Sequence, residues 1–333
     1  MTIEKASTKA VLILPRLRIQ NANAISSPLT WGFPSITAFT GFMTALERKI
    51  GSAAGISFFG VGVVCHNFEP QVSGVYNYVF NQSRHPVLKD GSSAPFFEEG
   101  RAHAEVTLVF DVELTADLPN EAKCHELATH ISSTVSVMRL AGGSVMPNLN
   151  GRTTQANLVL MPDDAESKKK ELRKISRKLL PGFALVSRDD LLETRLDEMR
   201  LNSSDASWLD AWLDLSRINF RASRDESKNE MTGEVIEKVK WTNDKRPGWL
   251  VPIPVGFVAI SELYPPGEVD GARNQTLPFQ FVESIYSIGQ WISPHRLTDI
   301  KGIFWEPFYD QVTGVYRCIN DYKTHSYSNS EII

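Results

Sequence analysis

The sequence predicts an α+β fold: a ferredoxin-like or RRM-type unit followed by a mixed, largely helical C-terminal half. Three observations lead to this prediction. Stretches with a hydrophobic period of two alternate with stretches of helical period in the order β-α-β-β-α-β. A long polar insertion separates the second and third strands, and the second half opens with stretches of helical pattern. With 333 residues, 42% of them hydrophobic, the chain is long enough to bury a sizeable core.

Each element of the first half follows from its residue pattern. In the first strand, Arg16 and Arg18 lie on one face and apolar residues on the other, because side chains alternate across a strand. Pro34 and Ser35 open the first helix, in which apolar residues recur at helical spacing. The strands are predicted over residues 10–20, 56–65, 102–114 and 157–161, and the helices over 35–50 and 120–138.

The rest of the chain is less regular. Residues 66–98 are polar, rich in Gly, Pro and Asn, and poorly periodic, and insertions this long in a compact domain are usually functional. The second half predicts a basic helix over 165–180, a charged surface loop over 222–247, and further helices over 189–201, 204–217 and about 278–292. We therefore divide the chain into an RRM-like palm, 1–161, and a C-terminal region, 162–333, packed on it.

The charge distribution limits how the chain can meet nucleic acid. The net charge of −4 argues against a free-standing, non-specific nucleic-acid binder, which is usually basic. Residues 168–178 nevertheless carry seven basic side chains and one acidic one, a local charge of +6 that leaves −10 for the remainder. An acidic body with one basic strip is typical of a subunit whose contact with nucleic acid is local.

Composition also indicates the cellular compartment. The chain has three cysteines, Cys65, Cys124 and Cys318, which are odd in number and far apart, as expected in a reducing cytoplasm without a disulfide framework. No apolar run approaches the ~20 residues that span a bilayer, and the first residues lack a signal-peptide pattern. We expect a cytoplasmic protein without a membrane partner.

Residues 12–34 carry the groups that hold single-stranded nucleic acid. The guanidinium groups of Arg16 and Arg18 suit phosphates, with ion pairing to a neighbouring side chain as the alternative. The amides and hydroxyls that follow can bind base edges and phosphates or cap their own turn; they belong to Gln20, Asn21, Asn23, Ser26 and Ser27. Trp31 can stack on a base or pack in the core, and we expect Phe33 in the core.

Two further groups of candidates lie near the same strands. Arg101 and His103 stand where the insertion rejoins the sheet, close to where Cys65 and His66 leave it. Arg139 and the pair Gly142-Gly143 can form a phosphate-binding backbone nest, or simply a tight turn.

The basic helix is the third candidate surface. Such a charge run is usually a solvated face, but on an acidic chain it can also contact guide or target nucleic acid. The cations expected there are Lys169, Arg173, Lys174, Arg177 and Lys178. The turn that contains His295 and Arg296 is a weaker candidate for a partner contact.

No cofactor or metal is expected. Cys65-His66 and Cys124-His125 look like metal-binding pairs, but adjacent residues do not easily share one ion. A zinc site needs about four ligands at suitable spacing, and this sequence lacks them.

Seven blocks of the sequence together resemble a known family. They are LPRLRIQNANAISSPLTWGFPS (14–35), EEGRAH (98–103), MRLAGGS (138–144), KLLPGFALVSR (178–188), LDLSRINF (213–220), KRPGWLVPIPVGF (245–257) and QWISPHR (290–296). The chain is similar to the family of second subunits of the Csy (subtype I-F) CRISPR surveillance complex, which belongs to the Cas-five group. The blocks keep their order and cover nearly the whole chain, so the resemblance is specific.

The resemblance implies a fold and a role. Family members have an RRM-type palm with a protruding thumb, which corresponds here to residues 66–98. They pair with the complex's large subunit, hold the eight-nucleotide 5′ handle of the guide crRNA, and work beside a filament-forming backbone subunit in antiviral defence. Target DNA is a further partner to consider. Guide cleavage belongs to a separate subunit in this subtype, so the resemblance implies binding rather than catalysis.

Two alternatives remain open at this point. Some other members of the Cas-five group cleave guide precursors, and His66 and His103 could act as general base and acid of a metal-independent endoribonuclease. A structural adaptor that joins the large subunit to the filament without touching RNA is the second alternative.

Overall fold

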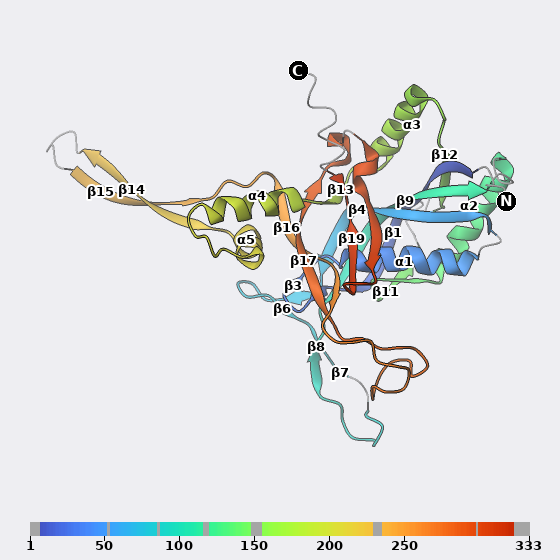
Figure 1. The fold of residues 1–333 in the computed structure, drawn as a ribbon, viewed down its shortest axis with the longest axis horizontal. Helices are drawn as coiled ribbons and strands as arrows, with labels where there is room; N and C mark the ends of the chain where they lie inside the picture. Colours follow the sequence, from blue (N-terminus) through green and yellow to red (C-terminus); the bar gives the residue numbers. More distant parts are fainter. Residues whose placement is uncertain are drawn as a thin grey trace.

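The computed structural model describes residues 7–51, 54–84, 87–115, 120–147, 155–228, 235–297 and 299–322. A strand-rich body carries several projections (Figure 1). They are the arm formed by β14 (Phe220–Lys228) and β15 (Val235–Asn243), the insertion that contains β7 (Gln82–Arg84) and β8 (Phe96–Glu98), the loop over 260–281, and the helix α3. The α-helices are α1 (Ile36–Ile50), α2 (Glu121–Ser136), α3 (Ala165–Lys178), α4 (Asp189–Arg200) and α5 (Trp208–Ser216). Two 3₁₀ helices are η2 (Pro294–Arg296) and η3 (Ile300–Ile303).

The strands fall into a main sheet and four small hairpins. The main sheet contains β1 (Ser7–Asn23), β4 (Ile56–Pro70), β9 (Arg101–Thr115), β10 (Arg139–Leu140), β11 (Gly143–Met146), β12 (Asn157–Leu160), β13 (Phe183–Ser187), β16 (Trp249–Ala259), β17 (Val282–Ile292), β18 (Phe304–Asp310) and β19 (Val315–Ile319). The hairpins pair β2 (Ile25–Ser27) with β3 (Thr30–Trp31), β5 (Val72–Ser73) with β6 (Val79–Phe80), β7 (Gln82–Arg84) with β8 (Phe96–Glu98), and β14 (Phe220–Lys228) with β15 (Val235–Asn243).

The predicted elements of the first half are confirmed. The strands expected over 10–20, 56–65, 102–114 and 157–161 are β1, β4, β9 and β12, and the two expected helices are α1 and α2. Ser35 caps α1 by accepting a hydrogen bond from the backbone N–H of Thr37, and Asn120 caps α2 in the same way. The antiparallel neighbours run in the order β12, β1, β9, β4.

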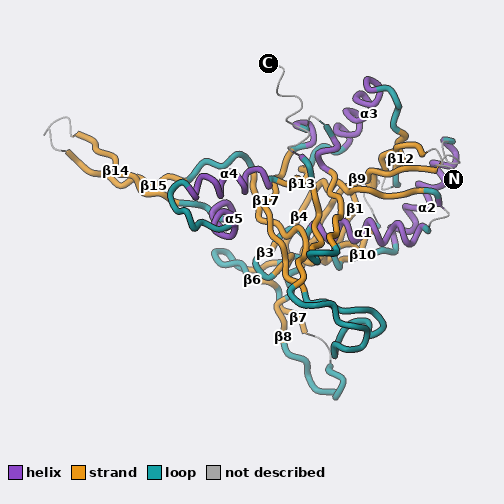
Figure 2. The backbone as a smooth tube through the Cα atoms, viewed as in Figure 1, coloured by secondary structure: helices purple, strands orange, loops and turns teal. Residues whose placement is uncertain are grey.

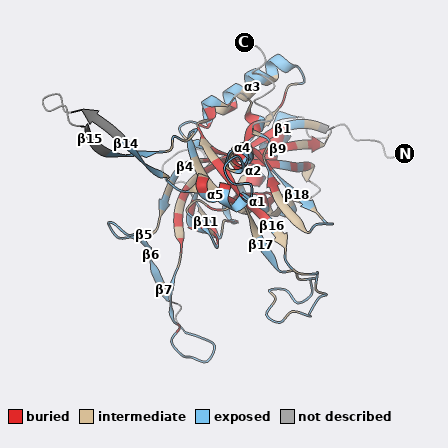
Figure 3. Ribbon diagram, turned by 60° about the vertical axis from the view of Figure 1, so that its left-hand side comes forward, coloured by how far each residue is buried: buried red, intermediate tan, exposed pale blue. Residues whose placement is uncertain are grey.

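The two faces of this sheet have different covers. On one face, α1 and α2 pack against β1 and β9 through Phe39, Leu46, Ile131, Leu12 and Phe110 among others. On the other face, α3 and η3 cover only part of the sheet, over Val11, Ile13, Val64 and Val109. The buried residues concentrate in the centre of the molecule, while α3 and the insertion are mostly exposed (Figure 3).

The C-terminal half is strand-rich, so the expectation of a largely helical half is wrong. From β4 the sheet continues through β13, β17, β16 and β19 to β18, and β18 pairs again with β4. These strands therefore close a ring with β4. Trp305 is fully buried there and donates its indole N–H to the carbonyl of Leu185 at 2.9 Å.

The helix predicted around 278–292 is wrong for an identifiable reason. Its apolar residues recur at helical spacing, but the segment is β17, paired on one edge with β13 and on the other with β16. A strand between two neighbours can bury both faces and then shows no simple alternation. The β-branched and aromatic content of 282–292 was the better indicator.

The charged surface loop predicted over 222–247 is also wrong, because most of this segment is the β14–β15 arm. A two-stranded arm without a covering layer need not bury one face, so its sequence shows the alternation of a half-buried strand only over 238–242. Figure 2 shows the arm as two long strands, in contrast to the insertion, where short strands are joined by loops.

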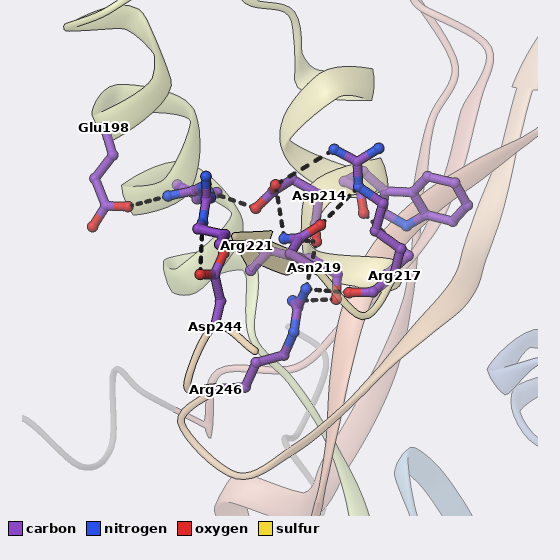
Figure 4. A network of polar contacts seen from close by, with 11 residues as sticks. Glu198, Asp214, Arg217, Asn219, Arg221, Asp244 and Arg246 are labelled. Atoms are coloured by element: carbon purple, nitrogen blue, oxygen red, sulfur yellow. Dashed lines mark hydrogen bonds and ion pairs between the residues drawn. The ribbon is translucent and has the colours of Figure 1, made fainter. Parts of the chain in front are cut away.

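A network of ionic and amide contacts holds the root of the arm (Figure 4). Asp214, at the end of α5, accepts hydrogen bonds from Arg195 at 2.7 Å and from Asn219 at 2.9 Å. Arg246 donates to the carbonyls of Asp214 and Leu215, each at 2.5 Å, and to that of Arg217. Arg221 and Asp244 form an ion pair at 2.7 Å across the two chain segments.

None of the helices in the described parts of the chain is long and apolar enough to cross a membrane.

Asp111 provides a test of the partly covered sheet face. Burial raises the pKa of its carboxyl, although Lys301 and Lys9 act in the opposite direction. Because the folded protein holds this proton more tightly than the unfolded chain, the contribution of Asp111 to stability falls as the pH rises through the carboxyl range. We expect Asp111→Asn to raise Tm at pH 7, with the gain disappearing near pH 4. The exposed control Asp163→Asn should leave Tm unchanged at both pH values, and an equal gain at both would contradict the prediction.

Candidate nucleic-acid interface

Part of one sheet face is polar and uncovered, next to the area under α3. We call it the open strip and define it by residues of four neighbouring strands: Arg18 and Gln20 of β1, Ser144 of β11, His103 and Glu105 of β9, and Asn67 and Glu69 of β4. The register pairs Arg18 with Glu105, Gln20 with Ser144, and Asn67 with Glu105. Paired residues of antiparallel strands point to the same face, so these side chains share one surface.

A bulge in β1 puts both predicted arginines on this face. The pairing of β1 with β9 shifts between Leu14 and Leu17, and Arg16 adopts φ 52°. A strict period of two from Leu14 would point Arg16 into the core with the apolar residues. The extra residue resets the alternation, so Leu17 stays buried while Arg16 and Arg18 lie on the opposite face, as predicted.

Arg16 forms an ion pair, the alternative considered for it. Its guanidinium lies 2.9 Å from the Glu105 carboxylate, and both side chains are mostly buried. It also donates to the carbonyls of Leu180 and Pro181, each at 3.4 Å. Arg16 therefore joins the segment after α3 to the sheet and neutralises Glu105.

Arg18, Gln20 and Asn21 have the opposite character. All three are exposed, and within the described residues their side chains make no hydrogen bond or ion pair. A second shift of register, between Ile19 and Ala22, places Asn21 at φ 56°. Its backbone N–H donates to Nδ1 of His103 at 3.2 Å, which fixes the imidazole on the strip. One cation and two amides are thus available to a ligand on this surface.

The other polar residues of the 12–34 segment bind their own loop. The amide of Asn23 donates to the carbonyl of Ile25 and accepts from its N–H. The Ser27 hydroxyl is buried and accepts from the N–H groups of Leu29 and Thr30, and the Ser26 hydroxyl bonds to Thr30. These contacts shape the β2–β3 turn.

The aromatic residues at the end of the segment differ in burial. Trp31 is 57% exposed and meets the ring of Phe80, in the insertion, edge-on at 5.5 Å. Phe33 stacks on Phe39 of α1 at 5.6 Å, so it belongs to the core as expected.

Arg139, Gly142 and Gly143 form a tight hairpin beside β1. Ala141 and Gly142 have φ of 49° and 77°, which closes a two-residue turn between β10 and β11. Arg139 donates to the carbonyl of Gly142 at 2.7 Å. A Cβ at Gly143 would lie 2.6 Å from the carbonyl oxygen of Gln20, so only glycine lets the hairpin approach β1 this closely. Arg101, on β9, forms a 3.4 Å ion pair with Glu99.

The two histidines of the nuclease alternative are in unequal positions. His66 hydrogen-bonds through Nδ1 to the carbonyl of Pro181 at 2.6 Å and through Nε2 to the Thr107 hydroxyl at 2.7 Å. Both of its ring nitrogens are therefore engaged, whereas His103 makes a hydrogen bond through Nδ1 alone among the described residues, in the contact with Asn21. General acid–base catalysis needs ring nitrogens that can reach the substrate.

The neighbouring Cys65 is a poor nucleophile. Burial raises the pKa of its thiol to about 12, and Glu105 acts in the same direction. Among the described residues, no three side chains of His, Cys, Asp or Glu gather closely enough to hold a metal ion.

The structure brings two distant basic segments together. Lys169, Arg173 and Arg177 of α3 line a groove of about 460 Å³ with Pro294, His295 and Leu297. We call it the basic groove. Lys174 lies elsewhere on the helix and pairs with Glu171 at 2.6 Å, and Lys178 lines a separate cavity with Arg16. His295 bonds to the Ser293 hydroxyl at 2.8 Å, and Arg296 is exposed beside it.

Several residues of the open strip were missed from the sequence. Asn67 and Glu69 lie on β4 beyond residue 65, where the strand was expected to end. The alternation of polar residues at 67 and 69 with Phe68 was the available signal. Ser144 and Glu105 become visible as neighbours only through the register.

Gly143→Ala tests the close approach of the hairpin to β1. The new Cβ would meet backbone atoms of Gln20 and Ala22, so we expect a loss of roughly 1–3 kcal/mol of stability, measured by urea unfolding. Gly41→Ala is the control: it lies in α1 with open space around its Cβ and should gain roughly 0.5–1 kcal/mol. Equal stabilities for the two variants would exclude the proposed constraint.

Comparison with known proteins identifies the family of the chain. The family model described as CRISPR-associated protein (Cas_Csy2) matches residues 12–318. The "CRISPR-associated protein Csy2" of Pseudomonas aeruginosa (strain UCBPP-PA14) is 46% identical over 314 residues, which are 93% of this chain and 94% of the relative. The range that the family model matches includes all seven blocks quoted from the sequence, so the resemblance is confirmed. The chain belongs to the Csy2 family of CRISPR-associated proteins.

Proposed function

We propose that this chain is a non-catalytic, RNA-binding subunit of a type I-F CRISPR surveillance complex. It binds the 5′ handle of the guide crRNA on the open strip and docks the large subunit, in the cytoplasm. The observation that carries the proposal is the group of Arg18, Gln20 and Asn21, exposed and without partners in the described residues, on one sheet face.

The arrangement of the first half supports an RRM-type palm. Two helices cover one face of the antiparallel strands β12, β1, β9 and β4, and the opposite face is partly open. RRM proteins bind single-stranded RNA on such an open face. The insertion between β4 and β9 then serves as the thumb, and the Trp31–Phe80 contact ties it to the palm.

The side chains of the open strip suit RNA, which offers base edges as well as phosphates, better than a ligand that offers negative charge alone. Arg18 supplies charge for a phosphate, and the amides of Gln20 and Asn21 can donate to and accept from base edges. Since Arg16 neutralises Glu105, that carboxylate repels phosphates less than an unpaired one would.

The net charge of the chain predicts that its affinity for handle RNA depends on the large subunit. With a charge of −4 and few free cations on the strip, the chain alone should bind handle RNA weakly, and much more tightly together with the large subunit. Filter-binding titrations of handle RNA with and without the large subunit measure this difference. Equal affinities would refute the shared-binding claim.

Arg18→Ala with Gln20→Ala tests the open strip directly. Loss of one charged and one amide contact should weaken binding of handle RNA to the complex with the large subunit by about ten- to a hundredfold. Arg48→Ala is the control for charge, because Arg48 lies on α1 at the opposite face of the sheet. The open strip is excluded as the RNA site if the double variant binds like the control.

We further propose that the basic groove contacts phosphates of the target DNA. The groove joins cations of α3 to His295, and none of its lining residues is acidic. Arg173→Ala with Arg177→Ala should lower the slope of log affinity against log salt by about 2 for duplex DNA bound to the assembled complex. Lys170→Ala with Lys174→Ala removes the same charge from the same helix outside the groove and should lower the slope less. Identical slopes for the two pairs would contradict a specific contact.

The nuclease alternative makes a separate prediction. It requires the purified chain to cleave repeat RNA without metal, and His103→Ala to abolish the cleavage. Because both ring nitrogens of His66 are engaged, we expect no cleavage product from the wild-type chain in gel assays containing a metal chelator. Cleavage that disappears in the His103 variant would replace the binding proposal.

A further inference from the structure

A second hollow lies where the β2–β3 turn, β4, β13, β16 and β17 meet. Its volume is about 560 Å³, within the range of small-ligand sites. We call it the aromatic cavity and define it by the rings of Trp31, Phe33, Phe183, Trp249 and Trp291 and by Asn67. It was not apparent from the sequence, because its rings come from four separate segments.

Three of the five rings are unusually exposed for their size. Trp249 is 59% exposed, Trp31 57% and Phe183 44%. Four of the five rings contact one another: Phe183 meets Trp249 at 5.7 Å, and Trp291 meets Trp249 at 6.3 Å and Phe33 at 4.9 Å. The cluster is thus ordered by its own packing and leaves flat ring surface at the mouth.

A polar group of suitable chemistry lies at the rim. The side chain of Asn67 is exposed and, within the described residues, makes no hydrogen bond. An amide offers a donor and an acceptor together, which matches the edge of a nucleobase. The other polar side chains of the wall are occupied, since His66 is held through both nitrogens and Ser26 by Thr30.

Asn67 also connects the cavity to the open strip. It pairs in register with Glu105, whose neighbour on the other side is Arg18. Within the described parts of the chain, β13 pairs with β4 at Val64 and Cys65, and no strand pairs with this edge of β4 at Asn67. The distance from Arg18 to this edge is two strand spacings, about 10 Å. A strand of RNA on the strip can therefore turn over the edge into the cavity.

We propose that the aromatic cavity binds one splayed nucleobase of the guide RNA, stacked on the exposed rings and hydrogen-bonded by Asn67. This inference rests on the proposed RNA-binding function and adds a base site to it. Stacking on aromatic rings tolerates any base, while the amide adds a preference among base edges. An apolar side chain of a partner protein would use the rings but not the amide.

The test combines protein and RNA variants in the complex with the large subunit. Handle RNAs that carry one abasic nucleotide, at each position in turn, are titrated against the wild type and Trp249→Leu. The leucine keeps apolar volume and removes the ring. We expect one abasic position to weaken binding to the wild type about tenfold and to have no further effect on Trp249→Leu, because the lost contact is the same.

Matched variants separate stacking from folding. Trp249→Phe keeps a ring and should retain most of the affinity, and Asn67→Ala should weaken binding at the same RNA position. Trp241→Ala, an exposed tryptophan on the β14–β15 arm, should bind like the wild type. If Trp249→Leu fails to fold, Trp249→Phe with Asn67→Ala still tests the site, because neither variant removes the packed cluster.

The outcomes distinguish this inference from the proposed function. In one outcome, the losses of affinity caused by Trp249→Leu and by an abasic nucleotide add at every RNA position, while Arg18→Ala still weakens binding. The cavity is then not a base site, and the open strip remains the RNA site. If Trp249→Leu weakens binding of the large subunit and leaves RNA binding intact, the cavity is a protein contact. If neither the Arg18 nor the Trp249 variant changes RNA affinity, both proposals fail.

Discussion

The alternation of side chains along β1 determines most of what this chain presents to a ligand. β1 pairs with β9 along its length and with β11 and β12 on its other edge, so it lies inside the sheet. Its apolar residues anchor the core beneath α1 and α2, and its polar residues form the open strip. The bulge at Pro15 and Arg16 reconciles these two requirements within one strand. Without that extra residue, Arg16 and Arg18 would point to the same face as the apolar residues Leu12 and Leu14.

Arg16 shows how structure and site depend on each other. Its ion pair with Glu105 lies under the segment that follows α3, and the mostly buried charges are mutually compensated. The same contact removes one negative charge from the strip and leaves Arg18 as its unpaired cation in the described residues. A residue that appeared from the sequence to be a ligand contact thus neutralises a carboxylate beside the exposed Arg18.

The first half of the fold could be predicted from the sequence because each element carries a strong local signal, such as the cap at Ser35 or the alternation in β9. β17 and the β14–β15 arm could not, since neither buries one face and exposes the other. For the site, Arg18, Gln20 and Asn21 were predictable by residue type, but which polar groups are already satisfied was not. The self-bonding of Asn23 and Ser27 depends on the turn that they form. The aromatic cavity depends on contacts between segments more than two hundred residues apart, which local patterns do not contain.

The root of the β14–β15 arm lies beside the network around Asp214. Nine residue pairs give each strand a length of about 30 Å, so a rotation of about 10° at the root moves the outer end by about 5 Å. The contacts of Asn219 and Arg246 oppose such a rotation, because these two residues flank the arm and donate to Asp214 of α5. Arg195 of α4 holds Asp214 in turn. Because the arm is long, a small change of angle at this root gives a much larger displacement at its far end.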